Sequence, residues 1–178
     1  MIRHTIALLL LAGVALAQPI RPTLFEIPGH GRLRVVIPLE WTATAKVNAQ
    51  PSAAIVHVFP LRGAAFDGQM TTVWLDQANR ARMTPDTIKA NVRKSAETLL
   101  KNSQNQSVIM KELRGEDIAG HYYTLGDSNP GQGEFKYITQ GTYLAGELLV
   151  AFRFQHRAAD SSDLAQFLEM LAGSRQVS

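Results

Sequence analysis

Cysteine is absent from this sequence of 178 residues. That absence excludes a thiol nucleophile, a zinc–cysteine site and an iron–sulfur cluster held by thiolates. A chain of this length can bury a stable core without disulfide bonds. The sequence also lacks a hydrophobic run long enough to span a membrane, because the longest covers residues 6–16 and a spanning helix needs roughly 20 residues. We therefore expect no membrane anchor.

An excess of charge of one sign is also lacking. The chain has 18 Lys and Arg residues against 15 Asp and Glu residues. The basic residues are scattered along the chain, whereas a nucleic-acid interface needs a dense basic patch. Nucleic acid is therefore not an expected partner.

Catalytic and metal-binding motifs are missing as well. No Gly-x-Ser-x-Gly turn is present to expose a serine nucleophile, and Gly131-Gln132-Gly133 lacks the lysine and the following helix of a phosphate-binding loop. The histidines show neither His-x-His nor His-x-x-x-His spacing, although three of them could still converge in the fold. We predict a protein that is not an enzyme, with no catalytic residue, no metal site and no cofactor.

The N-terminus has the three parts of a signal peptide. Arg3 and His4 form a short positive region, residues 6–16 are almost continuously apolar, and Ala15-Leu16-Ala17 is the small-x-small pattern that a signal peptidase cleaves. We predict that residues 1–17 are removed and that the mature chain begins at Gln18. The protein should then be periplasmic or secreted.

The rest of the chain reads as one domain with short flanking segments. Prolines punctuate its start, so we expect a flexible leader over residues 18–30. A single globular domain is predicted over residues 31–174, with a tail over residues 175–178.

Hydrophobic periodicity predicts strands separated by two helices. The stripe Ile88, Val92 and Leu99 indicates a helix over residues 85–101, with Thr84 as its N-cap, and a second helix covers residues 164–171. Loops are expected at residues 46–52 and 127–133. The expected strands are residues 32–37, 54–59, 70–75, 107–113, 119–125, 134–140 and 148–156.

Short turns between these strands predict antiparallel pairing. The amphipathic helices then need a sheet face to cover. The predicted fold class is α+β, an antiparallel sheet of about six to seven strands packed with two amphipathic helices.

Two stretches of the sequence resemble a known family. The first is Val35-Val-Ile-Pro-Leu-Glu-Trp41, and the second runs from Tyr137-Ile-Thr-Gln-Gly-Thr-Tyr143 through residues 146–154 to the closing helix. In residues and in element order, this chain resembles the PsbP-like family of α+β domains, which takes in DcrB-like envelope proteins and Mog-type proteins. The resemblance implies binding and accessory roles. It implies no shared active site, so no functional residue is transferred.

Aromatic residues concentrate in the C-terminal strands, and period-two alternation directs some of them away from the core. Exposed tyrosines on a strand, together with a polar glycine-rich loop, are typical of a contact surface. The possible contact surface comprises Tyr122, Tyr137, Tyr143, Asp127 and Asn129.

The leading functional hypothesis is an exported, non-enzymatic accessory protein that binds another cell-envelope or secreted component. One alternative is a carrier that holds a small apolar ligand in a pocket between helix and sheet. A second alternative is a cone-shaped α+β enzyme of the nuclear-transport-factor type. A filled interior favours the first hypothesis, a deep apolar pocket the second, and a deep pocket with an acid or histidine the third.

Overall fold

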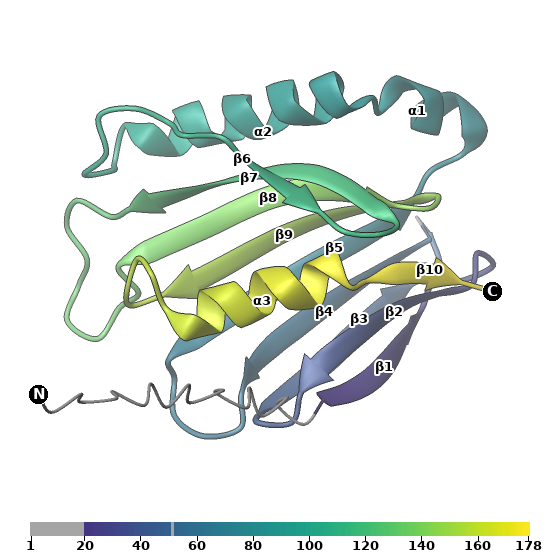
Figure 1. Ribbon diagram of the computed structural model, residues 1–178, viewed down its shortest axis with the longest axis horizontal. Coiled ribbons are helices and arrows are strands. Elements are labelled where there is room, and N and C mark those ends of the chain that lie inside the picture. The colour runs from purple at the N-terminus through teal and green to yellow at the C-terminus, as the bar shows by residue number, and fades with distance from the viewer. Residues whose placement is uncertain (1–19, 51) are drawn as a thin grey trace, which may run out of the picture.

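The computed structural model describes residues 20–50 and 52–178, which form two antiparallel sheets and three helices (Figure 1). The predicted signal peptide, residues 1–17, lies outside the described residues. So do residues 18 and 19, which begin the predicted leader.

The larger sheet has seven strands in the order β3-β4-β5-β9-β8-β7-β6. All neighbours pair antiparallel, which confirms the predicted α+β class and sheet. Its strands are β3 (Trp41–Asn48), β4 (Ala53–Pro60), β5 (Phe66–Trp74), β6 (Lys111–Arg114), β7 (Ile118–Gly126), β8 (Tyr137–Ala145) and β9 (Leu148–His156).

The smaller sheet has the order β1-β2-β10, with β1 (Ile20–Glu26), β2 (Arg32–Pro38) and β10 (Arg175–Val177). The predicted flexible leader is therefore wrong for β1, and the predicted tail is wrong for β10. Phe25 anchors β1, because it is only 6% exposed and pairs with Leu33. Pro22 is tolerated there since β1 is an edge strand, where one side of the backbone needs no partner.

Two of the helices are those that the sequence predicts. Helix α2 (Pro85–Leu100) begins at Thr84, whose hydroxyl accepts from the Thr87 backbone N–H at 3.2 Å. Helix α3 (Ser162–Ala172) begins at Ser161, which accepts from the Leu164 backbone N–H at 3.1 Å. Both caps satisfy N–H groups that a helix start leaves unpaired.

A third helix, α1 (Gln77–Arg82), was not predicted. It has no buried residue, so no apolar stripe marks it in the sequence. Strand β3 was not predicted either, and the expected loop at residues 46–52 overlaps its last three residues. As an edge strand, β3 buries only Trp41 fully, so the hydrophobic alternation that identifies a strand is weak.

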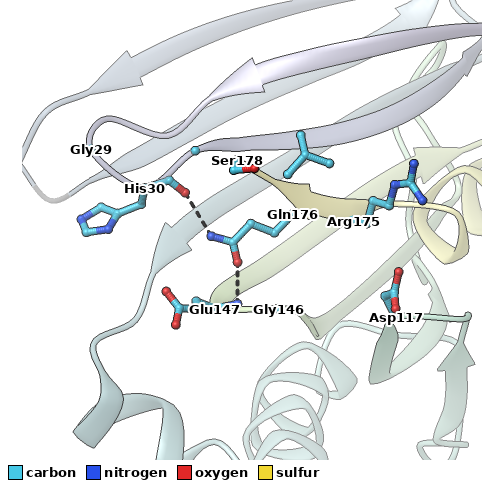
Figure 2. Close-up of a pocket in the computed structure, with 10 residues that line it drawn as sticks. Gly29, His30, Asp117, Gly146, Glu147, Arg175, Gln176 and Ser178 are labelled. Atoms are coloured by element: carbon cyan, nitrogen blue, oxygen red, sulfur yellow. Dashed lines mark hydrogen bonds between the residues drawn. The ribbon is translucent and has the colours of Figure 1, made fainter.

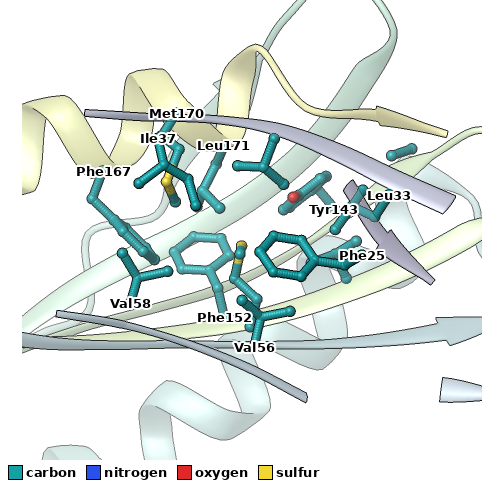
Figure 3. Close-up of a cluster of buried hydrophobic side chains, with 14 of the residues drawn as sticks. Phe25, Leu33, Ile37, Val56, Val58, Tyr143, Phe152, Phe167, Met170 and Leu171 are labelled. Carbon is teal, nitrogen blue, oxygen red and sulfur yellow. The ribbon is translucent and has the colours of Figure 1, made fainter. Parts of the chain in front are cut away.

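Helices α2 and α3 lie on opposite faces of the seven-stranded sheet (Figure 1). Helix α2 packs on β7 and β8 through Ile88, Val92 and Ala96. On the other face, α3 and the three-stranded sheet enclose the main core. Figure 3 shows this core, where Phe152, Phe167 and Leu171 fill the interior; their exposed fractions are 2%, 0% and 0%.

Among the described residues, no helix is long and apolar enough to cross a membrane.

Candidate binding surface

Tyr143 does not belong to any surface, so its prediction as a contact residue is wrong. Its side chain is completely buried, and its hydroxyl lies 2.9 Å from Ser174 Oγ. Because Ser174 Oγ donates to the Leu171 carbonyl at 2.7 Å, the Tyr143 hydroxyl is the donor in this pair. Burial raises the pKa of Tyr143 well above its ordinary value, and the bond to Ser174 opposes that rise only in part.

Tyr122 and Tyr137 are half-buried. The Tyr122 ring lies 6.5 Å from Phe152 on the core side of the sheet, and burial raises its pKa. The Tyr137 ring stacks on His156 with centroids 5.6 Å apart, and the Lys136 ammonium lies 5.7 Å from its centre. Much of each ring is therefore used for packing.

Asp127 and Asn129 are exposed in the connection between β7 and β8, the loop that the sequence predicts. Asp127 Oδ1 accepts from the Asn129 backbone N–H at 2.9 Å, which is a turn-forming contact. Asp127 and Tyr137 both line one hollow of about 220 Å³, whereas Tyr122 and Tyr143 contact the main core further along the strands. The predicted contact residues thus do not form one surface.

That hollow, here called the β8 hollow, lies beside the C-terminal end of α2. Its apolar members are Leu99, Leu125, Phe135 and Ile138, and Arg153 and Gln155 of β9 form another side. The two β9 residues connect the hollow to a larger surface, which sequence reasoning missed.

This larger surface, the open face, is the part of the seven-stranded sheet that α2 leaves uncovered. Helix α2 contacts β7 and β8, so no helix in the described part of the chain lies over the same face of β9, β5, β4 and β3 (Figure 1). Strand register defines its members, because residues directly opposite each other share a face. The open face comprises Thr42, Thr44, Lys46, Ile55, His57, Phe59, Asp67, Gln69, Thr71, Val73, Leu149, Ala151, Arg153 and Gln155.

Hydrogen-bonding side chains cross this surface in one row. His57 pairs with Gln69, and Gln69 pairs with Arg153 on the next strand. At the boundary with α2, the Tyr123 hydroxyl donates to Gln140 Oε1 at 3.1 Å. Burial raises the Tyr123 pKa, and the positive charge of Arg153 is among the influences that oppose the rise, so the two groups lie near each other. The row presents donors and acceptors to solvent.

A second hollow, of about 730 Å³, opens at the other end of the molecule (Figure 2). Gln176 builds it: its Nε2 donates to the His30 carbonyl at 3.0 Å, and its Oε1 accepts from the Glu147 backbone N–H at 2.7 Å. Gly31 is required at its rim, since its φ is +80° and an added Cβ would lie 2.4 Å from the Val177 carbonyl oxygen.

Several polar groups of this second hollow are engaged in contacts within the protein. The His30 ring stacks on Trp74 at 3.7 Å, and the Trp74 indole N–H donates to Glu147 at 3.1 Å. Glu147 also pairs with Arg80. The bonds from Trp74 and then Arg80 lower the Glu147 pKa. These contacts join the β1–β2 turn, β5, α1 and the β8–β9 turn. The Glu147 carboxylate is occupied by Trp74 and Arg80.

Nothing in the described ranges, 20–50 and 52–178, groups three His, Asp or Glu side chains in a way that could hold a metal ion. His156 is buried and hydrogen-bonded within the protein, with Thr139 Oγ1 at 3.1 Å and the Ala158 carbonyl at 2.6 Å from its two ring nitrogens.

The fold can be compared with solved structures. No family model matches the sequence, and no curated protein matches it. The solution structure of cyanobacterial PsbP (CyanoP) from Synechocystis sp. PCC 6803 is similar, with a TM-score of 0.53 over 93% of this chain and 96% of that chain. The chain has the PsbP fold. At 14% identity this similarity establishes the PsbP fold alone, which agrees with the resemblance seen in the sequence, and it transfers no functional residue.

Proposed function

We propose that the protein is an exported, non-enzymatic accessory protein that binds another envelope or secreted component through the open face. The observation that supports this proposal is a sheet surface over β9, β5, β4 and β3 on which no element of the described residues lies. A rigid sheet presents side chains at fixed spacing, so binding there requires little ordering of the protein.

The chemistry of the open face suits a polar partner. Ala151 and Arg153 are exposed at its centre, and His57 is exposed two strands away. Lys46 and Arg153 outnumber the single carboxylate, Asp67, so the partner surface should be mildly acidic.

The interior supports a binding role over the two alternatives. The space between α3 and the sheet is occupied by large side chains, with Phe154 and Phe167 stacked at 4.5 Å and both completely buried (Figure 3 shows Phe167). A carrier of an apolar ligand or a cone-shaped enzyme needs an enclosed cavity at that position.

Site-specific cross-linking tests the proposal. A photo-reactive side chain at position 151, in the middle of the open face, should form an adduct in envelope extract, and mass spectrometry identifies the partner. The same group at Ala90, an exposed alanine of α2, is the matched control and should form no such adduct. Ala151→Glu should then weaken capture of that partner about tenfold, because it adds bulk and negative charge at the centre, while Ala90→Glu should not.

Equal adduct yields from positions 151 and 90, or no adduct from position 151, would contradict the proposal. Circular dichroism of both variants establishes that their folds are intact, which is expected because Ala151 and Ala90 are exposed.

A further inference from the structure

The three-stranded sheet has an outward face over which no other element of residues 20–50 and 52–178 lies, and α3 borders this face at Ile20, Val36 and Pro38. Phe25, Leu33, Val35 and Ile37 point into the main core, so the alternate residues on these strands point away from it. We call this the arginine–aliphatic face and define it by Ile20, Pro22, Leu24 and Glu26 of β1, Arg32, Arg34 and Val36 of β2, and Arg175 and Val177 of β10.

Aliphatic side chains gather on this face. Ile20 is 61% exposed and Leu24 is 47% exposed, and Leu39, which directly follows β2, is 45% exposed. Ile20 pairs with Pro38, so it lies next to the turn that carries Leu39. Single exposed apolar residues are ordinary, but a group on one surface indicates an interaction site.

Positive charge lies directly beside the aliphatic group. Leu24 pairs with Arg34, and Arg34 pairs with Arg175 on its other side. Arg32 follows one pair further along the same face, opposite Glu26. Within residues 20–50 and 52–178 the ion pairs are Arg80–Glu147 and Arg114–Glu112, so no Asp or Glu carboxylate lies within 4.0 Å of these three guanidinium groups. Arg32 is engaged within the protein, since its Nη2 donates to the Ser178 main-chain oxygen at 2.6 Å, and Arg34 and Arg175 therefore carry the positive charge that is available for binding.

We propose that the arginine–aliphatic face docks the protein peripherally on an anionic phospholipid bilayer. Guanidinium groups bind phosphate with two parallel hydrogen bonds, and aliphatic side chains next to them enter the boundary between headgroups and acyl chains. Three guanidinium groups against one carboxylate, Glu26, give the face a net positive charge, which is complementary to anionic headgroups. A protein partner would be expected to meet aromatic anchors, and this face has none.

This contact is independent of the proposed function. The open face lies on the α2 side of the seven-stranded sheet, whereas the three-stranded sheet packs on the α3 side (Figure 1). Bilayer docking would therefore leave the open face free for its partner.

Vesicle sedimentation tests the proposal. The purified chain should bind vesicles of equimolar phosphatidylcholine and phosphatidylglycerol, and high salt should weaken that binding. Arg34→Glu with Arg175→Glu should reduce binding at least about tenfold, since both charges reverse at the lipid surface. Leu24→Ser should reduce binding as well, by removing an aliphatic group that enters the bilayer.

Two matched variants lie on other surfaces. Arg93→Glu with Lys94→Glu makes the same charge change on exposed α2, and Ile109→Ser removes a side chain that is 71% exposed near β6. Both should bind as the unaltered protein does. All variants carry the same N-terminus, so any contribution from residues 1–19 is equal among them.

Absence of vesicle binding by the unaltered protein overturns the proposal. So does an equal loss in the matched variants, or binding that survives Arg34→Glu with Arg175→Glu when circular dichroism shows the native fold. A dimer in light scattering that Leu24→Ser abolishes would assign the face to a second copy of the chain instead.

Discussion

The ring of His156 sits in a chain of hydrogen bonds whose direction can be assigned. A carbonyl oxygen only accepts, so Nδ1 carries the proton that is donated to Ala158 at 2.6 Å, and Nε2 accepts from the Thr139 hydroxyl at 3.1 Å. Thr139 Oγ1 in turn accepts from Thr124 at 2.8 Å. Burial lowers the pKa of His156 below the ordinary value, so the ring is neutral at pH 7, and the Nε2 atom accepts in this form.

A pH dependence of stability follows from that lowered pKa. The unfolded chain takes up a proton on His156 below about pH 6.5, while the folded protein resists it. The free energy of unfolding should therefore fall as the pH is lowered from about 7.5 to 5.5, by on the order of 1 kcal/mol. Urea unfolding at the two pH values measures this, and His156→Gln should flatten the dependence. An unchanged dependence in that variant would show that other groups cause it.

The two tyrosines of β8 show how far the burial of a single residue can be predicted from the sequence. Alternation places Tyr137 and Tyr143 on one face of β8, and the sequence allows that much. Which stretch of that face is covered depends on α3 and the three-stranded sheet, which bury Tyr143 completely. Strand β10 lies too far along the chain for local patterns to pair it with β2.

Helix α2 gives a prediction at the scale of an element. Val92 is 4% exposed and Leu99 is half-buried at the edge of the β8 hollow. Val92→Asp should lower the free energy of unfolding by about 3–5 kcal/mol, because the carboxylate would be buried without a partner. Leu99→Asp should cost only about 1–2 kcal/mol, since its carboxylate can reach water. Denaturant titration compares the two, and equal losses would contradict the assigned helix face.

The connection between β7 and β8 gives a second prediction. Gly126 pairs with Tyr137, so these strands are hairpin partners, as the sequence predicts. Replacing residues 127–136 with Asn-Gly, a tight hairpin turn, should leave the fold intact and lower the free energy of unfolding by no more than about 2 kcal/mol. The lost contacts are mainly exposed hydrogen bonds such as Ser128 Oγ to the Asn102 carbonyl at 3.1 Å. Collapse of the thermal transition would show that the loop is structurally required.

At the scale of the whole molecule, the sequence predicts that residues 1–17 are removed as a signal peptide, and this can be tested. Intact-mass measurement on protein from its native cells should give a chain that begins at Gln18, because the small-x-small pattern ends at Ala17. A mass that retains residues 1–17 would contradict export.

Much of the architecture was predictable because it rests on local patterns. The apolar stripe of α2 and the alternation in β4, β5, β7 and β9 identify elements directly. The smaller sheet was not predictable, because β1 and β10 have few buried residues and gain their order from β2. The open face depends on where α2 lies, which also requires the tertiary fold.

Strand β2 pairs with β1, at the start of the described chain, and with β10, at its end. The two pairings therefore become possible at different times while the chain is synthesised. Arg32 donates to the Ser178 carbonyl at 2.6 Å, although 146 positions separate the two residues. A ribosome makes β1 and β2 early, so their hairpin can form while one edge of β2 is still bare. A bare strand edge is a template for incorrect pairing. Each newly made chain therefore passes through an interval in which β2 is vulnerable, and the interval closes only when β10 arrives.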